Sequence, residues 1–194
     1  MKKHVGKLTS IRAMLRLSCV IAFLIWPAAL NPLAGSEYDV EAAYLLNFGK
    51  FVQWPADVVR TETSFDICIL GQDPFNGKLQ NLVANERMDG KPIHDRSIVN
   101  TTEEEGCAIV YVAESEEAHL AKTVATFDRR GELLVSGLPH FLDDGGTIQF
   151  VIERRRVRFE VNLDSASKDG LILSSELLKV AVSVTGKPQS GAVQ

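Results

Sequence analysis

The stretch 145–181 constrains the fold most, because apolar and polar residues alternate along two consecutive runs. A period of two residues is typical of strands with one buried face. The polar residues between the runs, 153–156, predict an exposed hairpin turn, although they include no Gly or Asn that would fix the turn type. The apolar positions are Ile148, Phe150 and Ile152 in the first run, and Val157, Phe159, Val161 and Leu163 in the second.

Helical signals follow this hairpin. Asp164 is placed to cap a short helical turn that Gly170 ends. Ser174 or Ser175 can then start a closing helix. The stretch therefore predicts a hairpin followed by a helix, against which the earlier part of the chain packs. The apolar side of the closing helix consists of Leu177, Leu178, Ala181 and Val182.

The first 35 residues have the pattern of a secretory signal peptide. Five basic residues precede an apolar run, 17–30, that contains no acidic residue, and the small residues Ala34, Gly35 and Ser36 follow it. The run is shorter than the roughly 20 residues that span a bilayer, so export with cleavage is the prediction and an uncleaved anchor is the alternative. Lipid attachment at Cys19 is not expected, because Arg16 occupies a position where a lipobox has an apolar residue.

Export changes the charge balance of the chain. The full sequence has 21 basic and 25 acidic residues, a net charge of −4. Cleavage near Gly35 removes five basic residues and no acidic ones, which leaves 16 − 25 = −9. A chain this acidic is a poor binder of nucleic acids or anionic membranes, because both carry negative charge. Protein partners with basic surfaces remain open.

Two cysteines remain after removal of the signal peptide, Cys68 and Cys107. An even pair in an exported chain predicts a disulfide. The bond would close a loop of 107 − 68 = 39 residues. In the chain-entropy description, such a loop stabilises the fold by about 3–4 kcal/mol.

A helix is predicted over 36–54. Its apolar residues have helical spacing, its acidic residues 37, 39 and 41 lie in the first turn, and Trp54 and Pro55 end it. The aromatic residues on this side are expected to face the core rather than a ligand. The apolar stripe consists of Val40, Tyr44, Phe48, Phe51 and Val52.

Strand and helix patterns alternate between this helix and the hairpin. We expect strands over 65–70, 91–98, 107–113 and 132–136, and helices over 75–85 and 115–127. The strand 107–113 is apolar throughout, which is typical of a central strand covered on both faces. The alternation implies parallel pairing with right-handed crossovers. The fold class is therefore α/β: a three-layer domain over 36–184 with a mixed, mainly parallel sheet and a C-terminal antiparallel hairpin followed by a helix. The tail 185–194 is expected to be disordered.

The sequence contains no pattern that assembles catalytic chemistry. Residues 71–78 resemble a phosphate-binding loop, but the glycine spacing is one residue too long and Leu79 replaces the magnesium-binding hydroxyl residue. The histidines and cysteines lack metal-ligand spacing, and no nucleophile elbow is present. The acidic clusters 103–105 and 114–117 are explained as solvated turns and helix starts. We therefore expect no enzyme, no catalytic residue, no metal and no cofactor.

Four features together resemble the YfiR/HmsC-like family over 37–182. They are the opening EYDVEAAYLLNFGKFVQWP, the segment ICILGQDPF, the pair Cys68 and Cys107, and the stretch GGTIQFVIERRRVRFEVNLDSASKDGLILSSELLKVA. Members of this family are small periplasmic proteins. The resemblance implies repression of an inner-membrane diguanylate cyclase through its periplasmic domain, which lowers cyclic-di-GMP and biofilm formation. It also implies an outer-membrane lipoprotein that relieves repression by sequestering the repressor, and a homodimer.

The resemblance carries few residues over. The family's recurring cysteine pair matches Cys68 and Cys107, whereas a second disulfide of the family prototype has no counterpart, because no cysteine follows Cys107. Phe141, Arg154 and Arg155 are our candidates for partner binding, and ordinary loop packing and solvation are the alternative for each. Two other functions stay open: a small-ligand sensor that acts on another membrane signalling or transport protein, and, less favoured, a hydrolase.

Overall fold

The computed structural model describes residues 32–55, 63–103, 106–127 and 131–187. All of these residues except Pro32 belong to one compact unit, which begins at Leu33. The predicted signal peptide lies outside the described residues, except for its last positions. None of the described helices is long and apolar enough to cross a membrane.

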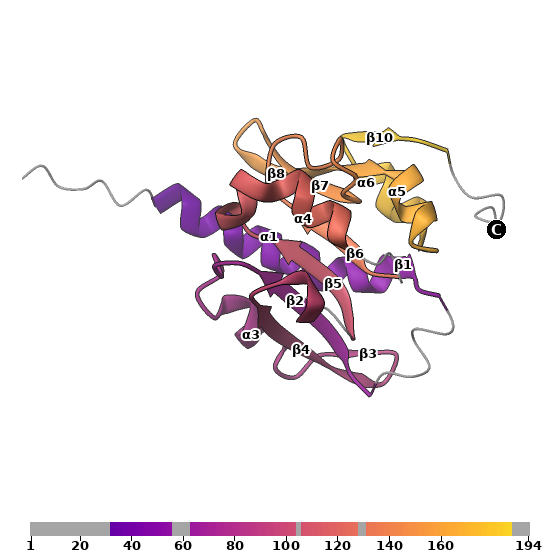
Figure 1. Ribbon diagram of the computed structural model, residues 1–194. Coiled ribbons are helices and arrows are strands. Elements are labelled where there is room, and N and C mark those ends of the chain that lie inside the picture. Colours follow the sequence, from indigo (N-terminus) through magenta and orange to yellow (C-terminus); the bar gives the residue numbers. More distant parts are fainter. Residues whose placement is uncertain (1–31, 56–62, 104–105, 128–130, 188–194) are drawn as a thin grey trace, which may run out of the picture. The chain divides into compact units, whose positions relative to one another are not determined.

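An eight-stranded sheet forms the middle of the domain (Figure 1), in the order β10-β8-β7-β6-β5-β2-β4-β3. The strands β4, β2, β5, β6 and β7 are mutually parallel, β3 and β8 pair antiparallel with β4 and β7, and β10 lies parallel to β8. The mixed, mainly parallel sheet of the prediction is confirmed, and β5 is central in it. The bounds are β2 Phe65–Leu70, β3 Arg87–Met88, β4 Lys91–Ile98, β5 Cys107–Val112, β6 Leu133–Ser136, β7 Ile148–Glu153, β8 Arg156–Asn162 and β10 Ser183–Thr185.

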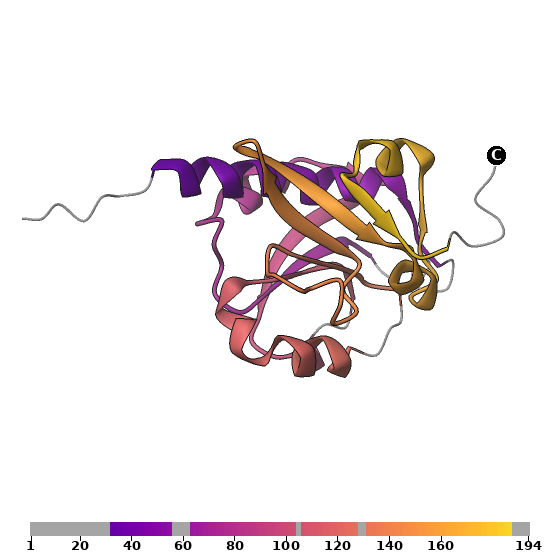
Figure 2. The same cartoon turned by 90° about the horizontal axis from the view of Figure 1, so that it is seen from above.

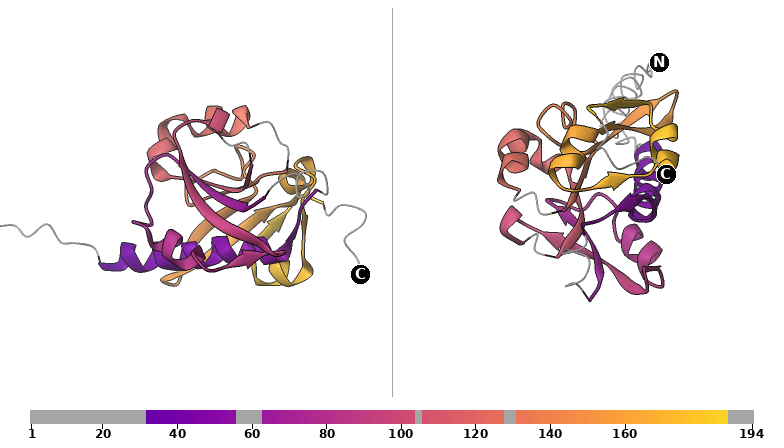
Figure 3. Two further views of the ribbon diagram at one scale, coloured as in Figure 1. Left: turned by 90° about the horizontal axis from the view of Figure 1, so that it is seen from below. Right: turned by 90° about the vertical axis from the view of Figure 1, so that its right-hand side faces the viewer.

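Helices cover both faces of the sheet, which makes the three layers that were predicted. Buried residues of four helices join the core on one face, and those of α4 join the core on the other. Figure 2 and both views of Figure 3 show α1 and α4 on opposite sides of the sheet. The helices of the first face are α1 Pro32–Phe51, α3 Lys78–Val83, α5 Leu163–Lys168 and α6 Ser175–Val180; the second face has the 3₁₀ segment η3 Glu114–His119 and α4 Leu120–Thr126.

The first core, between α1 and the sheet, is built around aromatic rings. Phe48 of α1 lies 5.2 Å from Phe159 and 5.9 Å from Phe150, measured between ring centroids. Tyr44, one turn earlier, lies within 6 Å of the same two rings. Offset and edge-to-face aromatic contacts add to the burial of apolar area. The alternating apolar positions of the hairpin are therefore what holds α1 on the sheet.

The second core, on the α4 side, contains the two cysteines. Cys68 of β2 and Cys107 of β5 are joined by a disulfide with a Cα–Cα separation of 5.8 Å. The two strands are hydrogen-bonded neighbours, as expected for a link within one sheet. The buried residues of this core are Cys68, Leu70, Ile98, Cys107, Val110, Val112, Leu120, Val124, Phe127, Leu134, Leu138 and Phe141.

The first helix differs from its prediction. It begins at Pro32 and ends at Phe51, so its first turn contains no acidic residue. Glu41 lies well inside the helix and is buried, whereas Val40 and Phe51 of the predicted apolar stripe are about 40 % exposed. Val52–Gln53 leaves the helix as strand β1 and pairs with strand β9, Ile172–Leu173. The prediction that Glu41 lies in the first turn, where the helix macrodipole would favour it, is therefore wrong, because the helix starts earlier than the apolar pattern indicated.

The other elements differ at their ends. The predicted helix over 115–127 is the 3₁₀ segment η3 followed by α4, and the helix predicted from Phe75 begins only at Lys78. Asn162, not Asp164, caps α5. Ser174 caps α6, as one of the two expected serines. That helix stops at Val180, and Ser183–Thr185 forms strand β10, so Thr185 belongs to the sheet rather than to a disordered tail. Residues 188–194 lie outside the described residues.

Candidate functional site

The disulfide lies beside a guanidinium group. The Nη2 atom of Arg96, on β4, is 3.0 Å from Sγ of Cys107 and 3.6 Å from Sγ of Cys68. Asp66, on β2, approaches Nε of Arg96 at 3.7 Å. Both cysteines are buried, so the bond links neighbouring strands from inside the second core. The arrangement fits a structural disulfide, because a buried sulfur is inaccessible to an attacking thiolate.

The carboxyl ends of β2 and β5 form the position where ligands bind in many open α/β sheets, because the connections from these two strands leave in opposite directions. Here the chain itself fills that position. Ser115 accepts a hydrogen bond of 2.9 Å from the backbone N–H of Gln72. A Cβ atom on Gly71, whose φ is +92°, would lie only 2.3 Å from the same hydroxyl oxygen. Gly71 therefore allows η3 to close directly over the end of β2.

Residues 71–78 lead into a helix, as predicted for this loop. Asp73 accepts a hydrogen bond from the N–H of Phe75, and Gly77 has a left-handed φ of 76° just before α3. Lys78, the lysine of the apparent phosphate-binding pattern, pairs with Asp39 of α1. These contacts explain the segment as a connection between β2 and α3.

A buried carboxyl group lies between α1 and the sheet. Glu41 is 6 % exposed, and the hydroxyl of Tyr111 on β5 donates a hydrogen bond of 3.0 Å to it. The pKa of Glu41 is raised to about 7, chiefly by burial; the Tyr111 hydrogen bond lowers it, and the carboxylates of Glu114 and Glu37 contribute to raising it. Burial also raises the pKa of Tyr38 to about 12, with Glu114 contributing. The carboxyl group of Glu41 can therefore exchange a proton near neutral pH.

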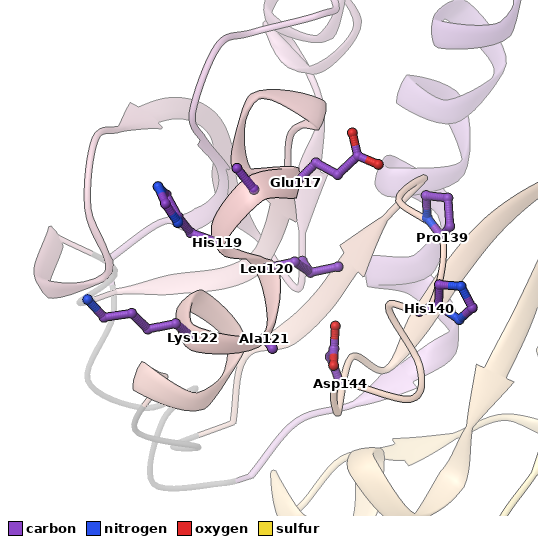
Figure 4. Close-up of a pocket in the computed structure, with 9 residues that line it drawn as sticks. Glu117, His119, Leu120, Ala121, Lys122, Pro139, His140 and Asp144 are labelled. Carbon is purple, nitrogen blue, oxygen red and sulfur yellow. The ribbon is translucent and has the colours of Figure 1, made fainter.

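A cavity of about 500 Å³ lies on the α4 side of the sheet, between residues 117–122 and the loop after β6 (Figure 4). Leu120 points toward that loop, whereas His119 and Lys122 point away from it. His140 has a positive φ of 62°, and its Nδ1 atom is 3.3 Å from a carboxylate oxygen of Asp143. The basic side chains therefore do not converge on one point of the cavity. Within the part of the chain that the structure describes, no three His, Cys, Asp or Glu side chains are grouped so that they could hold a metal ion.

The hairpin turn between β7 and β8 consists of Arg154 and Arg155, with φ values of 50° and 63°. We call this pair the arginine turn. Positive φ at both central residues is the pattern of a type I′ turn, which normally contains Asn-Gly or Asp-Gly. The left-handed region costs about 1–2 kcal/mol for a residue with a Cβ atom. Both side chains are exposed, so they are accessible to a partner.

Phe141, the third candidate for partner binding, is fully buried in the second core. Its ring is not accessible in this conformation, and the exposed residues of the same loop, His140 and Asp143, are what a partner would meet. The structure therefore does not bring Phe141 and the arginine turn together on one exposed surface.

Sequence reasoning did not identify the pair of Glu41 and Tyr111. The two residues are 70 positions apart, and Glu41 was interpreted as an acidic residue of the first helical turn, where the macrodipole would favour it. A signal was available, because Glu41 precedes Leu45 by four residues and Phe48 by seven, which places all three on one side of a helix. Leu45 and Phe48 are fully buried.

No curated protein matches the chain. Among solved structures, a conserved domain protein from Vibrio cholerae O1 biovar El Tor has 8 % identity and a TM-score of 0.48, and covers 79 % of this chain. The ABC domain in complex with L-Trp from Streptococcus pneumonia has 11 % identity and a TM-score of 0.48, and covers 78 % of this chain. The match spans 60 % of the length of each of those chains. The sequence model of the YfiR/HmsC-like family, by contrast, matches residues 38–182, and the chain belongs to that family.

Proposed function

We propose that this protein is a periplasmic regulatory binding protein that represses an inner-membrane diguanylate cyclase through the periplasmic domain of the cyclase. Repression lowers cyclic-di-GMP and so restrains biofilm formation. The observation that carries this proposal is membership of the YfiR/HmsC-like family across 38–182, which includes both cores and the hairpin. The proposed activity is a binding event and needs no catalytic residue.

The mechanism is a shift between two states of the cyclase. A repressor that binds the inactive state more tightly than the active state shifts the population toward the inactive one by its differential affinity. For a repressor that binds the inactive state alone, a concentration of 100 times Kd corresponds to about 2.7 kcal/mol. An outer-membrane lipoprotein that competes for the repressor would reverse the shift by lowering its free concentration.

The fold suits such a role, because its exposed surfaces belong to a domain that a disulfide links internally. The disulfide joins β2 to β5 in the middle of the sheet, and the aromatic residues of the first core hold α1 against the hairpin. A rigid scaffold reduces the conformational entropy that a binding protein loses when a complex forms. Exposed positions at the ends of the strands, including the arginine turn between β7 and β8, are then available for contact.

The test is the cellular level of cyclic-di-GMP in the native host, with and without the gene. We expect a rise on deletion that the wild-type gene reverses and a version lacking residues 1–35 does not. The version without residues 1–35 controls for the site of action, because it keeps the chain from Ser36 onward and lacks the expected export signal. An unchanged level of cyclic-di-GMP in the deletion strain, across several growth conditions, would contradict the proposal.

A small-ligand sensor is the second candidate, and the cavity between residues 117–122 and the loop after β6 favours it. Its volume of about 500 Å³ lies within the range of about 300–1,000 Å³ that is typical of small-molecule sites. The test is thermal unfolding of the exported chain with a panel of metabolites. A rise in melting temperature that Leu120→Ala abolishes, while the unliganded variant still unfolds cooperatively, would support the sensor; no rise with any compound would count against it.

A further inference from the structure

The described part of the domain contains two hairpins with two-residue turns, and the turns differ in sequence. The turn between β3 and β4 is Asp89 and Gly90, with φ values of 49° and 82°. In the arginine turn, the φ of Arg154 is 50°, close to that of Asp89, and the φ of Arg155 is also positive, at 63°. Asp-Gly is a preferred sequence for a type I′ turn, whereas two arginines are unfavourable there, since each has a Cβ atom. The chain therefore has the favourable residues in the hairpin at the β3 edge of the sheet and not in the hairpin of β7 and β8.

The arginine turn lies at the end of the hairpin where β7 is paired with β8 but no longer with β6. β6 pairs with β7 only at Ile148 and Gln149. The ladder between β7 and β8 continues to the pair of Glu153 and Arg156. Figures 1 and 2 show the loop between these strands beside the N-terminal half of α1, at the periphery of the domain. The turn is therefore accessible without any change in the fold.

Two exposed apolar side chains accompany the turn. Ile152 is 53 % exposed and is paired with Val157, a residue of the first core. Opposite residues of antiparallel strands share a face, so Ile152 lies on the α1 side of the hairpin. Val40 is 43 % exposed and precedes Tyr44 by one helical turn, which places it on the side of α1 that packs on the hairpin. Ile152 and Val40 thus extend the first core to the surface beside the turn.

Charge indicates what this surface binds. Arg154, Arg155 and Arg156 are consecutive and exposed, and none of them forms an ion pair within the described part of the chain. The exported chain as a whole carries a net charge of −9. Guanidinium groups bind carboxylates with two parallel hydrogen bonds, which favours arginine over lysine at such contacts.

We propose that the arginine turn, with Ile152 and Val40 beside it, is the docking surface for an acidic protein surface that presents an apolar side chain between its carboxylates. This inference rests on the proposed function, in which the protein acts by binding a protein partner. It explains why the turn keeps residues that its backbone conformation disfavours: the arginines contribute to the complex and not to the stability of the free protein. An anionic membrane is the less favoured occupant, because the remaining surface of the acidic domain would be repelled by it.

The decisive variant is Arg154→Asn combined with Arg155→Gly. It gives the turn its preferred sequence, so the melting temperature should rise by a few degrees, while binding should fall about tenfold or more because two charge-assisted contacts are lost. A loss of binding in a more stable protein cannot be attributed to misfolding. The matched control is Lys168→Gln combined with Lys179→Gln, which removes two exposed positive charges from α5 and α6. This control should leave binding unchanged.

Binding is read by photo-crosslinking in the native host, with benzoylphenylalanine in place of Glu153. The control site is Asp89, in the hairpin of β3 and β4, where β3 is an edge strand of the sheet. We expect a crosslinked protein from position 153 and none from position 89. The crosslinked peptide of the partner should contain more acidic than basic residues, and the crosslink should disappear in the Asn/Gly variant and persist in the lysine control.

Four results would overturn the inference. Three of them come from the crosslinking: a crosslink that survives in the Asn/Gly variant, an equal crosslink from position 89, or a partner peptide without excess acidic residues. The fourth is binding of the purified wild-type protein, but not of the Asn/Gly variant, to vesicles of three parts phosphatidylethanolamine and one part phosphatidylglycerol. Failure of the proposed function is distinguishable, because it is measured by cyclic-di-GMP in the deletion strain. If deletion raises cyclic-di-GMP and the Asn/Gly variant restores the wild-type level, the function stands and this surface is wrong.

Discussion

The hydroxyl group of Tyr111 donates a hydrogen bond of 3.0 Å to the carboxylate of Glu41, across the contact between β5 and α1. Both side chains are almost fully buried. A carboxylate is costly to bury in its charged form, and Glu37 and Glu114 add negative charge nearby. The packing of α1 on the sheet is therefore coupled to the protonation of Glu41.

Replacing Glu41 with Gln should change how stability depends on pH. The pKa of Glu41 is about 7 in the folded protein, and its usual value is 4.5. Between these values the folded state keeps a proton that the unfolded chain has released, so the free energy of unfolding falls as the pH rises. At 1.36 kcal/mol per pH unit, the total is about 3 kcal/mol. Urea unfolding of wild type and Glu41→Gln from pH 4.5 to 7.5 should show the wild type losing that amount relative to the variant.

Tyr111→Phe provides the matched comparison for Glu41. The hydrogen bond from Tyr111 lowers the pKa of Glu41 in the folded protein. Its removal should therefore extend the pH-dependent loss of stability to higher pH, because the loss ends at the pKa of the folded state and begins at that of the unfolded state. Parallel pH profiles for wild type and both variants would show that Glu41 does not titrate differently in the folded and unfolded states.

Removing the disulfide should destabilise the domain without changing the fold. Cys68→Ala combined with Cys107→Ala opens a loop of 39 residues, which corresponds to a loss of about 3–4 kcal/mol. Urea unfolding should show this loss. Dithiothreitol should lower the stability of the wild type toward that of the double variant and leave the double variant unchanged. Equal stability of the oxidised and reduced wild type would contradict a stabilising role.

The sequence predicted the elements whose signals are local and repeated. The alternating residues of 148–162 became β7 and β8, although Leu163, the last apolar residue of the predicted second run, begins α5; the apolar run from Cys107 became the central strand β5. Strands β2 and β5 are parallel, as strand–helix alternation predicted, and the bonded cysteines of these two strands fit the expected disulfide. Burial on one face or on both faces leaves a pattern in the residues themselves, which is why these elements could be inferred.

Elements that depend on distant partners could not be predicted in the same way. Strands β1 and β9 are two residues each and exist because Val52 lies beside Leu173. Strand β10 follows a helix that ends at Val180, and its three residues have no alternating pattern long enough to interpret. The burial of Phe141 likewise depends on a close approach to Gly146, which separate local patterns do not reveal.

Gly146→Ala should destabilise the loop after β6. A Cβ atom at this position would lie 2.2 Å from two ring atoms of Phe141, and Phe141 is fully buried. Overpacking of this kind costs about 1–3 kcal/mol. The control is Gly137→Ala in the same loop, where the nearest atom, an oxygen of Glu41, is at 3.8 Å and ordinary van der Waals contact is expected.

A double-mutant cycle identifies the cause of that destabilisation. Phe141→Ala leaves a cavity and should itself cost about 3–5 kcal/mol. If the clash is with the ring, Gly146→Ala should cost less in the Phe141→Ala background than in the wild type, as measured by urea unfolding. Additive losses would show that the effect of Gly146→Ala arises from the backbone instead.

Asn162 joins the same loop to the start of α5, and its substitution should loosen both. Its Oδ1 atom accepts the N–H of Ser165 as the helix cap, and its Nδ2 atom donates to the carbonyl of Leu142 at 3.2 Å. Asn162→Ala removes both contacts and should lower the free energy of unfolding by about 2 kcal/mol.

Asn162→Asp separates the two contacts. The carboxylate still caps α5, but it cannot donate to Leu142 and places its charge near a carbonyl oxygen. Hydrogen exchange should therefore become faster at the amides of Leu142 and Gly146 in both variants, and at Ser165 in Asn162→Ala alone. The contacts that hold this loop are hydrogen bonds, and no cysteine follows Cys107. In a Cys68→Ala, Cys107→Ala background, dithiothreitol should therefore leave the hydrogen-exchange rates of this loop unchanged. Unchanged exchange at Leu142 in Asn162→Asp would show that the bond to its carbonyl does not hold the loop.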